Sequence, residues 1–135
     1  MPSRVVHFEL HADDPDRCAQ FYADAFGWTI QKWGGPTDYW LVTTGEAPEV
    51  GIDGGIGRRQ HADDQTTNTI DVADLDAAVD KVVASGGSIT NAKHAVPGVR
   101  WLAYATDTES TRSGCCRRTS RRPSPLILRV RGVIL

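Results

Sequence analysis

The chain has 135 residues, of which 40% are hydrophobic and 24% are charged, a length and composition typical of one soluble globular domain. No apolar run approaches the roughly 20 residues that cross a bilayer. The first ten residues lack a signal-peptide pattern, so we expect neither membrane insertion nor export. The cysteines, Cys18, Cys115 and Cys116, are too few for a disulfide framework, which favours a cytoplasmic location.

The charge changes abruptly near residue 109. Residues 1–109 hold all 17 acidic side chains and 8 basic ones, a net charge of −9, whereas residues 110–135 hold seven arginines and no acid. Arginine-rich tails are typical of nucleic-acid binding. A translation of GC-rich DNA in the wrong frame also yields arginine, serine, proline and cysteine, so both explanations stay open at this point.

The first half of the chain predicts four strands. Residues 5–11 alternate between apolar and polar side chains, the pattern of a half-buried strand, with His7 and Glu9 on its polar face. His11 lies at the end of that face and is expected to be solvated. The other predicted strands are residues 29–33, 39–43 and 51–57.

Two helices are predicted by their end signals. Asp14 suits the N-cap of the first helix, and Gly27 suits the left-handed position that ends it. Asp74 likewise precedes a second helix, at residues 77–85, which Gly86 closes.

The two halves of the chain repeat at a spacing of 60 residues. This spacing aligns Asp14 with Asp74 and His7 with Thr67. The second half predicts strands at residues 67–72, 88–92 and 100–105. The repeat therefore predicts an α+β fold of two βαβββ modules, at residues 1–60 and 61–120, with no clear fourth strand in the second module.

Several short segments carry a family resemblance. They are Val6-His7-Phe8-Glu9-Leu10, Asp14-Pro15-Asp16-Arg17, Phe26-Gly27-Trp28 and Pro97-Gly98-Val99-Arg100-Trp101-Leu102. Over residues 4–109 the chain resembles the glyoxalase/bleomycin resistance/dioxygenase (vicinal oxygen chelate) superfamily, and in particular its predicted enzymes related to lactoylglutathione lyase. The resemblance implies a single glyoxalase-like domain over residues 1–120, whose modules curve a mixed sheet around a cup. It also implies a homodimer and a small-molecule ligand.

The resemblance also indicates where a metal would be held. Metal-dependent members carry four ligands, one from the first and one from the fourth strand of each module, for a divalent ion such as zinc, nickel, iron or manganese. His7 is the only match, because the other first-strand position falls on Thr67 and a fourth-strand position falls near Gly55. A catalytic site of this kind needs about three protein ligands, so we expect no firmly held metal.

The resulting function hypothesis is a glyoxalase-like protein that binds a small organic molecule in the cup. His7, Glu9, Tyr39 and Trp40 are the expected ligand-binding residues. His7 and Glu9 are also candidates for acid/base catalysis. Two alternatives stay open, a metal-dependent lyase or dioxygenase and a non-catalytic sequestering protein of the drug-resistance type, so the sequence does not decide whether the chain is an enzyme.

The tail at residues 110–135 departs from the family pattern. One permitted encoding of residues 109–119, read from its third base, gives Val-His-Pro-Phe-Gly-Leu-Leu-Gln-Ala-Asp, which has the pattern expected of the last strand. We therefore predict a frame shift near residue 109, a last strand that is lost or replaced, and an unpaired sheet edge. On this interpretation the arginines have no nucleic-acid partner.

Overall fold

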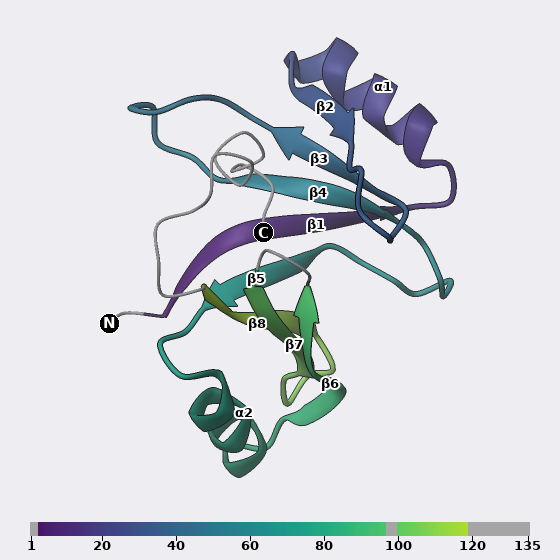
Figure 1. Ribbon diagram of the computed structural model, residues 1–135. Coiled ribbons are helices and arrows are strands. Elements are labelled where there is room, and N and C mark those ends of the chain that lie inside the picture. Colours follow the sequence, from purple (N-terminus) through teal and green to yellow (C-terminus); the bar gives the residue numbers. More distant parts are fainter. Residues whose placement is uncertain (1–2, 97–99, 119–135) are drawn as a thin grey trace. The chain divides into compact units, whose positions relative to one another are not determined.

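Figure 1 shows the computed structural model of the chain, which describes residues 3–96 and 100–118. Contacts divide these residues into two compact units. The first unit is residues 7–66, and the second is residues 67–96 and 100–118 together with residues 3–6.

The order of elements is βαβββ, repeated once. The first set is β1 (Arg4–Ala12), α1 (Pro15–Phe26), β2 (Thr29–Lys32), β3 (Tyr39–Thr43) and β4 (Asp53–Arg58). The second set is β5 (Thr67–Asp71), α2 (Leu75–Ala84), β6 (Ser88–Val96), β7 (Arg100–Thr106) and β8 (Arg112–Arg118).

Both helices begin at the predicted caps. The Asp14 side chain accepts a hydrogen bond from the Arg17 amide at 3.1 Å, and the Asp74 side chain accepts one from the Ala77 amide at 3.0 Å. These bonds satisfy amides that have no partner within the helix. Gly27 adopts the left-handed φ of 72° that ends α1, as its position in the sequence predicts.

The first unit packs α1 against one face of its sheet. Its strands lie in the order β2-β3-β4-β1, with β1 parallel to β4 and the other pairs antiparallel. The core contains four buried residues, namely Ala12, Trp40, Val42 and Ile56, with Phe8, Leu10, Cys18 and Ala19 packed against them. Because side chains alternate along a strand, the polar residues of β1 belong to the other face of the sheet.

The second unit has the same topology. Its strands lie in the order β5-β8-β7-β6, with β5 parallel to β8 and the other pairs antiparallel. Leu75 of α2, Ala103 of β7 and Cys115 of β8 form its core, joined by Val72 and Val79.

The last strand of the second unit is present, which corrects the expectation of an unpaired edge. Residues of the arginine-rich tail form β8, which pairs with β5 on one side and with β7 on the other. Cys115 and Cys116 are buried there, as cysteine side chains, which behave as small hydrophobic groups, commonly are. The rest of the tail, including the apolar residues 126–130, lies outside the described residues.

The α+β fold with two βαβββ modules is thus confirmed. Across residues 3–96 and 100–118, neither helix has the length and apolar character that crossing a bilayer requires. Cys18, Cys115 and Cys116 form no disulfide.

Candidate functional site

The candidate site lies on the polar face of the first unit. His7, Glu9 and His11 alternate along β1 with the residues that pack toward α1, so all three side chains belong to the same face. His7 is only 5% exposed, and the side chains of Glu9 and His11 are 14% and 8% exposed. Buried polar side chains need hydrogen-bond partners, and β3 supplies one.

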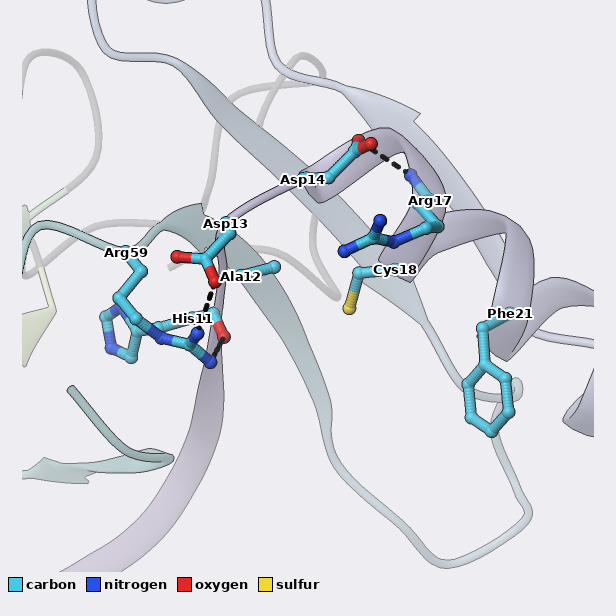
Figure 2. Close-up of a pocket in the computed structure, with 8 residues that line it drawn as sticks. All are labelled: His11, Ala12, Asp13, Asp14, Arg17, Cys18, Phe21 and Arg59. Carbon is cyan, nitrogen blue, oxygen red and sulfur yellow. Dashed lines mark hydrogen bonds and ion pairs between the residues drawn. The ribbon is translucent and has the colours of Figure 1, made fainter. Parts of the chain in front are cut away.

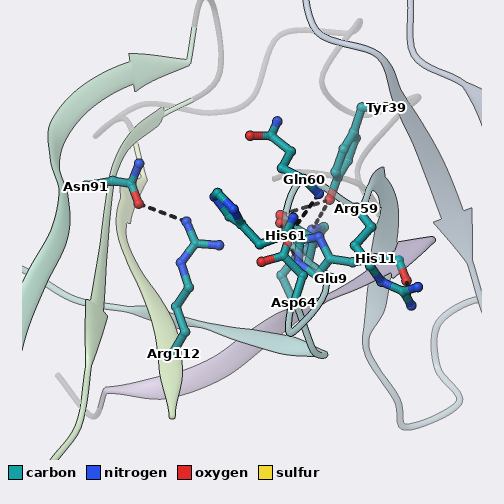
Figure 3. Close-up of polar contacts among 10 residues, drawn as sticks. Glu9, His11, Tyr39, Arg59, Gln60, His61, Asp64, Asn91 and Arg112 are labelled. Atoms are coloured by element: carbon teal, nitrogen blue, oxygen red, sulfur yellow. Dashed lines mark hydrogen bonds and ion pairs between the residues drawn. The ribbon is translucent and has the colours of Figure 1, made fainter. Parts of the chain in front are cut away.

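Tyr39 links two of these side chains. Its hydroxyl lies 3.0 Å from Nε2 of His7 and donates to Oε2 of Glu9 at 3.4 Å. Figure 3 shows the Tyr39 ring reaching toward Glu9 from the neighbouring part of the sheet. A phenol proton directed at Glu9 requires His7 to carry its own proton on Nε2. The structure therefore brings together three of the four predicted ligand-binding residues.

Gly55 makes room for Tyr39. It lies directly opposite Glu9 in the pairing of β1 with β4. A Cβ atom at Gly55 would overlap the ring and hydroxyl of Tyr39. The tyrosine thus occupies the space that a side chain at residue 55 would take. The sequence shows this glycine but not what lies over it, because Tyr39 reaches it from another strand.

The His11 side chain is only 8% exposed, whereas the sequence led us to expect a solvated side chain. Its Nε2 atom lies 3.4 Å from Oε1 of Glu9 and has no hydrogen bond among the described residues. The pKa of nearby Asp64 is held below its ordinary value, chiefly by a hydrogen bond from the Gln60 backbone amide, with His11 as a weaker cause. The polar face therefore combines two imidazoles with carboxylates in a partly buried setting.

Trp40 lies apart from the other three predicted residues. It is 5% exposed and belongs to the core cluster of the first unit, because it follows Tyr39 directly along β3 and so points to the opposite face. Lys32 and Arg58 lie over its ring, at 5.2 and 6.0 Å from the centroid. Trp40 is therefore a core residue whose ring also makes two cation–π contacts.

The residues present do not fit a four-ligand metal site. Of the positions that the resemblance assigns to ligands, Thr67 and Gly55 bear no imidazole, thiolate or carboxylate, and Tyr39 covers Gly55. No group of three or more His, Cys, Asp or Glu side chains within residues 3–96 and 100–118 is arranged to hold a metal ion.

The second unit repeats the geometry with different chemistry. Thr69 lies opposite Gly114 in the pairing of β5 with β8, as Glu9 lies opposite Gly55. Tyr104 of β7 packs near Gly114, where an added Cβ would lie 3.2 Å from its ring. Thr67 and Thr69 are 2% and 4% exposed. This unit therefore offers hydroxyl groups where the first unit offers an imidazole and a carboxylate.

A separate cavity of about 440 Å³ opens beside the start of α1. Its lining, shown in Figure 2, is His11, Ala12, Asp13, Asp14, Arg17, Cys18, Phe21 and Arg59. Arg59 is paired with Asp13 at 2.8 Å. Burial raises the pKa of the Cys18 thiol, and Arg59 partly opposes this rise, so the thiol is protonated at neutral pH. None of the predicted ligand-binding residues lines this cavity.

Comparisons with known proteins identify the fold. A family model described as "Bleomycin resistance protein-like N-terminal" matches residues 4–45. A hypothetical protein from Bacillus halodurans C-125 superimposes with a TM-score of 0.68 at 9% identity, covering 92% of this chain and 100% of that chain. The chain has the fold of the glyoxalase/bleomycin resistance/dioxygenase superfamily.

Solved members of that superfamily agree with this identification. A member from Vibrio splendidus 12B01 gives a TM-score of 0.61 at 16% identity, covering 86% of this chain and 99% of that chain. Methylmalonyl-CoA epimerase from Streptomyces coelicolor, solved with 2-nitronate-propionyl-CoA, gives 0.66 at 12% identity, covering 91% and 99%. No curated protein matches the chain. The predicted resemblance is confirmed, and at these identities it extends to the fold.

Proposed function

We propose that the polar face of the first unit binds a small organic molecule through Tyr39, His7 and Glu9, without a firmly held metal. The observation that carries this proposal is the Tyr39 hydroxyl, which bridges His7 and Glu9 and covers Gly55. A bridged, partly buried phenol is held in one orientation, as a ligand-binding group must be. Trp40 is left out of the proposed site because it belongs to the core.

The three side chains suit proton transfer as well as binding. The phenol oxygen lies within hydrogen-bond distance of an imidazole nitrogen and near a carboxylate. Such a group can donate to an oxygen of the ligand while the Glu9 carboxylate takes up a proton, which is general acid/base chemistry. Catalysis would require that a bound ligand present an acidic hydrogen to the Glu9 carboxylate while its oxygen accepts from the Tyr39 hydroxyl.

Coenzyme A derivatives are the first probes to test. One structural neighbour is a methylmalonyl-CoA epimerase solved with methylmalonyl-CoA and NH4+, and another was solved with 2-nitronate-propionyl-CoA. Both probes carry oxygen acceptors that a phenol and an imidazole can bind. Bleomycin is the matching probe for the sequestering alternative, because the matched family model describes a bleomycin resistance protein-like segment.

The test follows the ring resonances of His7 and Tyr39 by NMR while each probe is added to the full chain. We expect saturable shifts with at least one probe, weakened about tenfold in Tyr39→Phe, which loses one charge-assisted hydrogen bond. Tyr22→Phe removes the same atom from an aromatic cluster on α1 and is the matched control. Saturable binding that Tyr39→Phe and His7→Ala leave unchanged would contradict the proposal.

The two alternatives make different predictions. A metal-dependent lyase or dioxygenase would retain stoichiometric zinc, nickel, iron or manganese when purified without a histidine tag, and added metal would raise its rate. A sequestering protein would bind its ligand tightly and return it unmodified. Analysis of metal content and of the ligand after incubation therefore separates the three functions.

We also propose that the chain is a homodimer of the cytoplasm. The dimer rests on the family resemblance, and the three cysteines of the described residues, which form no disulfide, fit a reducing compartment. Sedimentation of the full chain at micromolar concentration tests the dimer, and a sedimenting species of 14.7 kDa would contradict it.

A further inference from the structure

Arg112 of β8 is held in place without a carboxylate partner among the described residues. Its guanidinium carbon lies 4.0 Å from the centroid of the Tyr104 ring. Its Nη2 atom donates to Oδ1 of Asn91 at 2.9 Å, and Figure 3 marks this hydrogen bond with a dashed line. The ring supports the guanidinium through a cation–π contact, and the hydrogen bond to the amide restrains its rotation. All three residues belong to the second unit.

Several cations of the described residues form ion pairs, unlike Arg112. Arg58 and Arg59 face Asp38 and Asp13, and Lys93 faces Asp76. Arg112 forms no ion pair within residues 3–96 and 100–118, although a guanidinium has five N–H donors. Its hydrogen bond to Asn91 uses one of them. The guanidinium of this partly buried arginine is held in place and keeps donors free of hydrogen bonds to the described residues. It is therefore arranged for an anion that residues 3–96 and 100–118 do not supply.

We propose that Arg112 binds the carboxylate or phosphate group of a small molecule through paired N–H···O bonds. Arginine recognises both groups through two parallel hydrogen bonds, and preorganisation of its planar fork reduces the entropy lost on binding. Tyr104 and Asn91 act as positioning residues. Neighbouring Thr69, whose hydroxyl lies near Gly114, adds no charge that would oppose an anion. This site is independent of the function proposed for the first unit.

The experiment titrates inorganic phosphate and, separately, acetate into the 15N-labelled full chain at constant ionic strength. The Nε–Hε resonance of Arg112, assigned by its loss in Arg112→Lys, reports binding in the unmodified protein. We expect a saturable shift with at least one of the two ions. Saturation with only one ion supports the proposal and assigns the site to phosphate or to carboxylate ligands. A linear drift of the resonance with both ions overturns the proposal.

Substitutions then test whether the fork matters. Arg112→Lys keeps the charge but loses the fork, and we expect the dissociation constant of the bound ion to rise about tenfold. Arg117→Lys changes an exposed arginine of the same strand and should leave it unchanged. Amide spectra check that each variant is folded. Equal weakening in the two variants, or full affinity in Arg112→Lys, would overturn the proposal.

Discussion

The two units share one backbone arrangement but carry different functional side chains. In each, the middle of the first strand lies opposite a glycine of the fourth strand, Gly55 or Gly114, and a tyrosine lies near that glycine. In the first unit the tyrosine is bound to His7 and Glu9. In the second unit the tyrosine lies beneath an arginine. The repeated backbone therefore fixes positions and not reactions, in line with the many functions that one fold can host.

The largest expected change concerns the second unit, where the printed reading frame decides what β8 is made of. We expect sequencing of the gene across codons 105–120 to show a base gained or lost near codon 109. The last strand would then contain Phe-Gly-Leu-Leu-Gln, which keeps a glycine but removes Arg112 and its anion site. A gene that encodes residues 105–120 as they stand in the sequence, with no base gained or lost, would contradict this prediction. The contrast between the two units would then stay as described.

A pair of glycine substitutions compares the two tyrosine positions directly. In Gly55→Ala the new methyl group overlaps the Tyr39 ring, so we expect a loss of about 1–3 kcal/mol in the free energy of unfolding. Gly114→Ala brings contacts of 3.2 Å and 3.3 Å with Tyr104 and Thr69. These contacts are relieved by small shifts and offset by the lower chain entropy of alanine, so its effect should stay within about 1 kcal/mol.

Urea denaturation measures the free energy of unfolding of both variants. The control is Gly34→Ala, whose methyl group would meet nothing within 4 Å. In Gly55→Ala, added ligand should no longer shift the ring resonances of His7, because a displaced Tyr39 no longer reaches His7 and Glu9. Equal costs at the two glycines would mean that the two tyrosines are packed alike, contrary to the structure.

Local sequence signals account for most of the fold. Asp14 and Asp74 predicted both helix starts, and the alternation over residues 5–11 predicted the polar face of β1. The strand β8 was missed because Ser-Gly-Cys-Cys lacks the β-branched and aromatic residues that mark strands. Its pairing with β5 and β7 stabilises it instead.

The candidate site was predictable only in part, because its contacts join different strands. The hydrogen bond from His7 to Tyr39 spans 32 residues of sequence, and no periodicity relates two strands at that separation. Trp40 concerns the direction of a side chain and not a contact between strands. Two successive residues of one strand point to opposite faces, so Tyr39 and Trp40 could not both line the polar face. That rule needs only the strand assignment at residues 39–43, which the sequence provides.

The smallest expected effect distinguishes the surface charges of the two units. Asp38 in the first unit faces Lys32 at 3.0 Å and Arg58 at 3.0 Å, and hydrogen bonds from these two cations lower its pKa below the ordinary value of 3.8. A carboxyl group whose pKa is lower in the folded chain stabilises that state above pH 3.8, and the contribution is lost as the pH falls through the folded pKa. Asp38→Asn should therefore lose slightly less stability on acidification than the unmodified chain.

The matched control is Asp76→Asn in the second unit, which removes a surface carboxylate that faces a single cation, Lys93. Thermal unfolding across the acidic range measures how the stability of both variants depends on pH. An equal reduction of this pH dependence in the two variants would show that general surface charge, and not the doubly paired Asp38, determines it.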